Sequence, residues 1–142
     1  MSDVDEIGWI SEKRDELLGY LARERLEHGA IAPEPYWFVA PYVSVWGIGS
    51  VQAPGRVGWW AVCGDHPTDY ISAGGLAAPR EVLRAIGERW IEVSSYMLRG
   101  RPHPTVTIGR PEDWPNLGDL LSRRARTFLE WANDDSVWTD AS

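Results

Sequence analysis

The fold is decided by residues 42–63, which read YVSVWGIGSVQAPGRVGWWAVC. Residues 42–48 and 57–63 are rich in β-branched and aromatic side chains, and a segment of turn-forming residues separates them. This pattern predicts two antiparallel strands joined by a turn. Within each strand both alternating sets of side chains are largely apolar, so we expect both faces of the strands to be covered.

Further strand-forming residues flank this pair. Residues 36–40 have a similar composition, and the intervening Pro41, which has no N–H group, indicates an edge or a bulge. Residues 69–72 can add a short third strand. The sequence therefore predicts a small antiparallel sheet of two or three strands.

Three segments have the apolar spacing of helices. Residues 3–28 form the first, with Gly29 as its stop signal. Pro79–Leu98 form the second, because proline suits a first helical position and an apolar stripe follows at helical spacing. The third spans residues 117–133, after a helix start at residues 111–113 that Pro115 cuts short. Arg14 and Arg124 interrupt apolar stripes, so we expect at least one of them to pair with an acid such as Asp65 or Asp69.

The predicted fold class is α+β, with three helices packed on the small sheet in the order α-β-β-(β)-α-α. A length of 142 residues favours a single domain over residues 1–142. Residues 134–142 are expected to fray, although Trp138 could anchor them. If the helices cluster on one face of the sheet, its other aromatic face would be open to a partner or to a second copy in a homodimer.

Acidic residues gather at both ends of the chain. The net charge is −7, with eight acids against four bases in residues 1–28 and four acids without a base in residues 127–142. Such a protein repels nucleic acid and suits a basic protein partner. We also expect no membrane segment and a cytoplasmic location, because long apolar runs are absent and Cys63 is the only cysteine.

The chain has nine tryptophans, and most are expected to fill the core. Trp59 and Trp60 should point to opposite faces of their strand. Trp9 and Tyr20 lie opposite the apolar stripe of the first helix, so they are candidates for a partner surface. The complete candidate partner surface combines these aromatic residues with acids from both ends: Trp9, Glu16, Tyr20, Glu27, Asp134, Asp135 and Trp138.

The turn over residues 63–70 concentrates potential chemistry. Its candidate ligand or turn site consists of Cys63, Asp65, Asp69 and Tyr70. His66 lies three residues after the thiol, a spacing open to a Cys-His nucleophile or to half of a zinc site. The alternative is a buried cysteine in a turn that the aspartates cap. Since neither a second pair of metal ligands nor a catalytic signature accompanies the turn, we expect no metal, no cofactor and no catalytic residue.

Several blocks together resemble a known family. These blocks are APYVSVW at residues 40–46, PGRVGWW at 54–60, CGD at 63–65, PTDYIS at 67–72 and PEDWP at 111–115. They resemble the domain-of-unknown-function family 4826, a group of uncharacterised small bacterial proteins. The resemblance extends over most of the chain and implies a bacterial, cytoplasmic, single-domain protein, but it implies no activity.

Two functional hypotheses remain open at this point. The first is a protein-interaction module without enzymatic activity, such as an immunity- or antitoxin-like binder of a basic partner. The acidic ends of the chain favour it, and so do Trp9 and Tyr20, which lie opposite the apolar stripe of the first helix. The alternative is a small enzyme or ligand-binding protein that uses the turn at residues 63–70, in which case Cys63, Asp65 and Asp69 should share a pocket.

Overall fold

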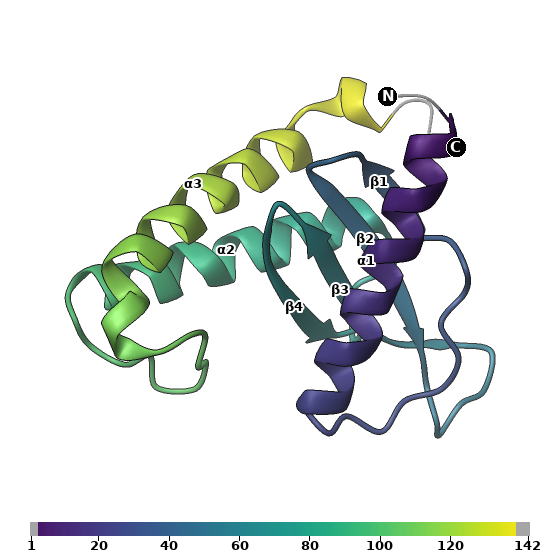
Figure 1. Ribbon diagram of the computed structural model, residues 1–142, viewed down its shortest axis with the longest axis horizontal. Coiled ribbons are helices and arrows are strands. Elements are labelled where there is room, and N and C mark those ends of the chain that lie inside the picture. Colours follow the sequence, from purple (N-terminus) through teal and green to yellow (C-terminus); the bar gives the residue numbers. More distant parts are fainter. Residues whose placement is uncertain (1–2, 139–142) are drawn as a thin grey trace. The chain divides into compact units, whose positions relative to one another are not determined.

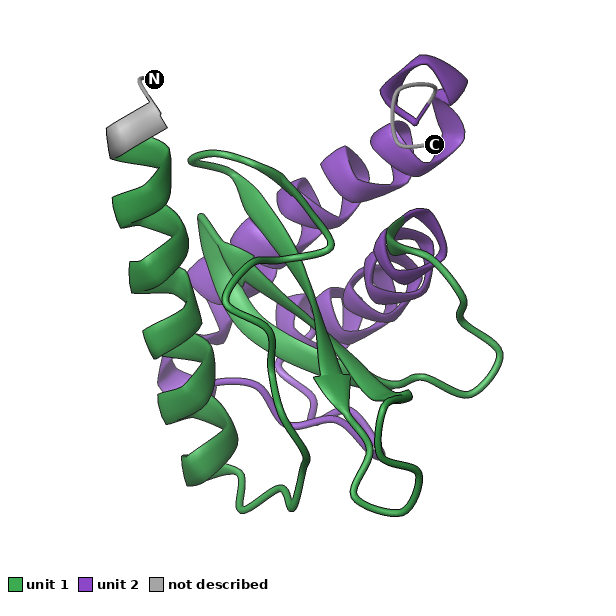
Figure 2. Ribbon diagram, turned by 90° about the vertical axis from the view of Figure 1, so that its right-hand side faces the viewer, with its two compact units in different colours: residues 1–79 green, residues 80–142 purple. Residues whose placement is uncertain are grey.

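The computed structural model describes residues 3–138 (Figure 1). Its elements are α1 (Asp3–Arg23), β1 (Trp37–Val39), β2 (Val43–Gly49), β3 (Val57–Gly64), β4 (His66–Ser72), α2 (Pro79–Leu98) and α3 (Trp114–Asn133), with short 3₁₀ helices at Pro111–Asp113 and Asp135–Val137. This architecture confirms the predicted α+β class and the three helices. The chain divides into two compact units, residues 1–79 and 80–142 (Figure 2).

The sheet has four strands, not two or three, and all neighbours are antiparallel in the order β1-β2-β3-β4. Pro41 marks a full reversal between β1 and β2, where the Tyr42 N–H donates to the Val39 carbonyl at 2.7 Å. β4 begins at His66, earlier than predicted, and includes Pro67. A proline is tolerated there because β4 is an edge strand, in which not every N–H is needed for the ladder.

The first helix ends at Arg23, five residues before its predicted end at residue 28. Arg25 adopts a left-handed φ of 56°, and the Leu26 N–H reaches back to the Leu21 carbonyl, which closes the last turn. Gly29 does not end the helix but allows the chain to pass close to the end of β2. Its N–H donates to the Gly49 carbonyl at 2.8 Å, and a Cβ there would lie 3.1–3.2 Å from backbone atoms of residues 49 and 50.

In the first unit, α1 lies across one face of the sheet (Figure 1). Leu17 and Leu21 of α1 are fully buried, and they share a core cluster with four residues of the sheet: Trp46, Ile48, Ala61 and Cys63. The residues of β2 and β3 that alternate with these are buried as well: Val43, Val45, Trp60 and Val62. Both faces of the central strands are therefore buried, as the sequence predicted. A homodimer through a sheet face stays a prediction.

Trp59 and Trp60 lie on opposite faces, as expected. Trp59 packs against the α1 side of the sheet. Trp60 lies on the other side, where Tyr36 meets it edge to face at 4.9 Å between ring centroids. The strand alternation thus divides the tryptophans between two layers.

The predicted helix Pro79–Leu98 has its expected bounds, and all of it except Pro79 belongs to the second unit. Its apolar stripe is buried, and Trp90 meets Phe128 of α3 at 5.2 Å between ring centroids. α3 begins at Trp114, not at residue 117, because Pro115 falls in its first turn, where no N–H is required. Trp138 donates its indole N–H to the Trp131 carbonyl at 2.8 Å, and the rest of the predicted tail, residues 139–142, lies outside the described residues.

Candidate functional site

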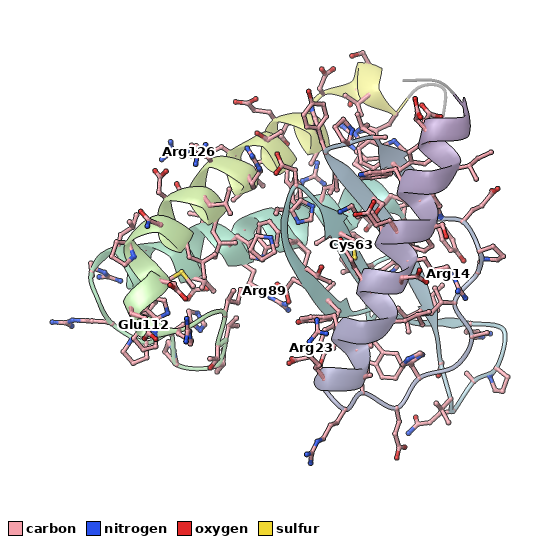
Figure 3. The ribbon with its side chains drawn as sticks, in the orientation of Figure 1. Arg14, Arg23, Cys63, Arg89, Glu112 and Arg126 are labelled. Atoms are coloured by element: carbon pink, nitrogen blue, oxygen red, sulfur yellow. The ribbon has the colours of Figure 1, made fainter. Side chains whose placement is uncertain are left out.

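Cys63 is a core residue of β3. It is fully buried, with its side chain beside α1 (Figure 3). Its sulfur accepts a hydrogen bond from Thr68 Oγ1 at 3.7 Å. Burial removes water from the thiol and raises its pKa from 9.0 to about 12. The thiolate is the form that attacks electrophiles and binds metals, so this environment suppresses the reactive species.

We therefore expect Cys63 to resist thiol reagents in the native protein. With a disulfide reagent at pH 8, the native protein should react at least about 100-fold more slowly than the protein in denaturant, because both access and thiolate content are low. Absorbance of the released aromatic thiol measures the rate. Equal rates in the folded and unfolded protein would contradict the buried position of this side chain.

The two aspartates of the candidate site do not lie beside Cys63, whereas Tyr70 packs against the same core cluster. Asp69 pairs with Val62, is 6% exposed and accepts the Tyr70 N–H at 2.9 Å. Tyr70 pairs with Ala61 and packs on the α1 side of the sheet. Since neighbours in a strand point to opposite faces, Asp69 lies on the face away from Cys63. Asp65 is exposed in the β3–β4 turn.

No metal centre emerges from the described part of the chain. Within residues 3–138, no group of three or more histidine, cysteine, aspartate or glutamate side chains could hold a metal ion. In the same range, no helix has the length and apolar character needed to cross a membrane.

Trp9 and Tyr20 of α1 are half-buried against the sheet. Trp9 lies 6.3 Å from Phe38 between ring centroids. Tyr20 lies 6.0 Å from Tyr70 in an edge-to-face contact. These rings therefore fix α1 to the strands, and only part of each ring remains accessible to a partner.

The carboxylates of α1 form a more exposed surface. Asp5, Glu12, Asp15 and Glu16 are all exposed, and we call them the acidic face of α1. Within residues 3–138, Glu12 and Asp15 make no ion pair. Glu16 pairs with Lys13 at 3.2 Å, although its own side chain is 44% exposed.

The two bases in the middle of α1 both have partners: Lys13 pairs with Glu16, and Arg14 bonds to backbone carbonyls. The Lys13 side chain is only 13% exposed. Arg14, labelled on α1 in Figure 3, donates from its terminal nitrogen to the Ile31 carbonyl at 2.7 Å and from Nε to the Ala32 carbonyl at 3.0 Å. Arg14 thus bonds to backbone carbonyls and not to the predicted acid, whereas the pairing of Arg124 stays a prediction. The outward charge of α1 is negative along its middle turns.

The remaining members of the candidate partner surface lie elsewhere. Glu27 is exposed but follows the end of α1, so it is not part of the helix. In the second unit, Asp134 accepts hydrogen bonds from Ser136, whose side chain lowers the pKa of this carboxyl. Asp135 pairs with Arg80 at 2.6 Å. Trp9, Glu16 and Tyr20 are therefore the members that α1 itself presents.

Open hollows border α1 in the first unit. One of about 410 Å³ is lined by Ile7, Ile10, Ser11, Arg14, Asp15, Pro33 and Glu34. Another, of about 400 Å³, is lined by Trp9, Lys13, Pro41, Gly64 and Asp65. Helical spacing predicts a buried Ile7 in the apolar stripe, whereas its side chain is 67% exposed, so the sequence did not indicate the first hollow.

Comparison with known proteins identifies the family. The family model described as "Domain of unknown function (DUF4826)" matches residues 3–138, nearly the whole chain, and the chain therefore belongs to this family. No curated protein and no solved structure matches it.

Proposed function

We propose that this member of the DUF4826 family is a protein-interaction module that binds a basic protein through the acidic face of α1. The observation that carries the proposal is the orientation of charge on this helix. Glu12, Asp15 and Glu16 are exposed, whereas the Lys13 side chain is only 13% exposed and pairs with Glu16, and Arg14 bonds to backbone carbonyls. An immunity- or antitoxin-like role in the bacterial cytoplasm fits such a surface.

The physical basis is electrostatic steering toward a partly aromatic patch. Exposed carboxylates attract a basic partner and accelerate its association, and Glu12 and Asp15 make no ion pair within residues 3–138. Trp9, at the edge of the acidic face, offers a rigid apolar contact that a partner can cover. The helix is anchored by Leu17 and Leu21 in the core, so the surface is presented in a fixed form.

Comparative capture of partners tests the proposal. We would immobilise the wild type, the double variant Glu12→Gln/Glu16→Gln and the control Glu88→Gln/Glu130→Gln. All four positions are exposed glutamates in helices, and both pairs change the net charge equally. The captured proteins are then quantified by mass spectrometry at low and high salt.

A basic protein should be retained by the wild type and by the control but released by the α1 variant or by salt. The variant loses two exposed ion pairs between α1 and the basic partner. This loss should weaken the binding of the partner by roughly 2- to 30-fold, since each such pair contributes about 0.2–1 kcal/mol. Capture that is equal for both double variants, or that does not respond to salt, would refute the role of the acidic face.

The alternative function, based on the turn at residues 63–70, has no comparable support. Cys63 is buried with a raised pKa, and Asp69 lies on the opposite face of the sheet from it. Because these groups do not share a pocket, we do not propose a catalytic or ligand-binding role for them.

A further inference from the structure

We infer that the hollow beside α1, lined by Ile7, Ile10, Arg14, Asp15, Pro33 and Glu34, receives a basic peptide segment that combines apolar and cationic side chains. We call this hollow the α1 groove. The inference rests on the proposed function and deepens it, because it specifies where a short part of the basic partner is held. Three features of the groove support it: an apolar floor, an acidic rim and walls that are held in place.

The floor of the groove is apolar. Ile7 is 67% exposed, the largest exposure among the large hydrophobic residues of the described chain. Ile10 packs partly against the core cluster, so the floor is anchored at one end. Covering Ile7 and Pro33 with an aliphatic side chain would remove apolar surface from water, which favours binding. The floor therefore selects a segment with at least one apolar residue.

The rim of the groove is acidic. Asp15 on α1 and Glu34 on the facing loop are exposed, and neither makes an ion pair within the described residues 3–138. Arg14 is the one base that lines the groove, and its guanidinium already donates to the carbonyls of residues 31 and 32. A lysine or arginine would complement this rim, and an acidic segment would be repelled.

The two walls of the groove are held together before any partner arrives. Arg14 projects from α1, and its two hydrogen bonds fix the beginning of the loop that carries Pro33 and Glu34. Preorganised walls lower the entropic cost of binding. A volume of about 410 Å³ accommodates a few side chains, so the structure favours a short segment as occupant.

A peptide titration followed by amide chemical shifts tests the groove. The probe is acetyl-Leu-Arg-Leu-Arg-amide, with acetyl-Leu-Glu-Leu-Glu-amide and acetyl-Gly-Arg-Gly-Arg-amide as matched controls. We expect saturable shifts that are largest at Ile7, Ser11, Asp15 and Glu34, with clearly weaker binding of both controls. Absence of saturation at these residues, or equal binding of the three peptides, would overturn the inference.

Two variants give a second readout on the same groove. Ile7→Ser should weaken the probe about fivefold through lost apolar contact, and Glu34→Gln about threefold through lost charge. Both side chains are exposed, so the fold should persist, and Glu88→Gln serves as the control. Unchanged affinity in both groove variants would overturn the inference.

The result also separates the groove from the proposed function. If Ile7→Ser and Glu34→Gln still retain a captured basic protein that Glu12→Gln/Glu16→Gln releases, the groove is refuted and the acidic face stands. If the probe binds in the groove but no basic protein depends on Glu12 and Glu16, the proposed function fails while the groove remains a binding site for basic peptides.

Discussion

Replacing Gly64 by alanine is expected to destabilise the protein by about 3 kcal/mol or more, because the new methyl group has no room. A Cβ at this position would collide with the Tyr42 carbonyl oxygen, and it would lie 2.7 Å from the Tyr42 carbonyl carbon and 2.8 Å from Val43 Cα. All of these are backbone atoms. They are held in place by the pairing of Val43 with Gly64 and by the hydrogen bond from the Asp65 N–H to the Tyr42 carbonyl.

Urea denaturation followed by circular dichroism measures this effect, with Gly8→Ala as the matched control. Gly8 lies in α1, and a Cβ there meets nothing within 4 Å. Alanine is the better helix former, so Gly8→Ala should stabilise the protein by roughly 0.5–1 kcal/mol. An unchanged denaturation midpoint for Gly64→Ala would contradict the close β2–β3 contact.

Trp46→Ala should cost about 3–5 kcal/mol of unfolding free energy. Trp46 is fully buried between α1 and the sheet, and its indole N–H donates to Ser44 Oγ at 2.8 Å. The substitution leaves a large cavity and removes this hydrogen bond. Because small proteins are stable by only about 5–15 kcal/mol, much of the population should unfold at moderate urea concentrations.

A graded series checks the origin of this loss. Trp46→Phe refills most of the space and should be clearly less destabilising than Trp46→Ala. Ser44→Ala keeps the ring but removes its acceptor, which should cost about 1–3 kcal/mol. Equal stabilities for Trp46→Ala and the wild type would show that this tryptophan does not support the core.

Periodic apolar patterns predicted the parts of the fold that depend on burial. Pro79–Leu98 has its expected bounds because its stripe and its first-turn proline point to the same helix. The prediction that Trp59 and Trp60 point to opposite faces is confirmed, since both faces of their strand are buried. Burial places apolar residues at regular intervals along the chain. A single residue that departs from this spacing does not change the predicted element.

Single turn residues were harder to interpret, since the same residue suits more than one geometry. Pro41 fits an edge, a bulge or a reversal, and the structure has a reversal. Gly29 fits a helix stop, yet it serves the close approach to Gly49, which lies far away in sequence. Contacts between distant segments decide such cases, and local chemistry does not contain them.

The location of the candidate site also depended on the fold and could not be predicted from single residues. The choice of Cys63 with Asp69 assumed a loop, but β4 begins at His66, and strand alternation then sends the two side chains to opposite faces. The acidic ends of the chain were visible in the composition. The bonds of Arg14 to the carbonyls of residues 31 and 32 depend on a segment that the fold brings beside α1, whereas the Lys13–Glu16 pair is local to the helix.

Zero-length cross-linking of the captured partner tests the central claim most directly. A carbodiimide joins a carboxylate to a lysine amine only when the two are in contact, and mass spectrometry then identifies the joined residues. The acidic face of α1 predicts cross-links from Glu12, Asp15 or Glu16 to lysines of the partner. Cross-links confined to acids of α2 and α3, such as Glu88 and Glu130, would contradict it.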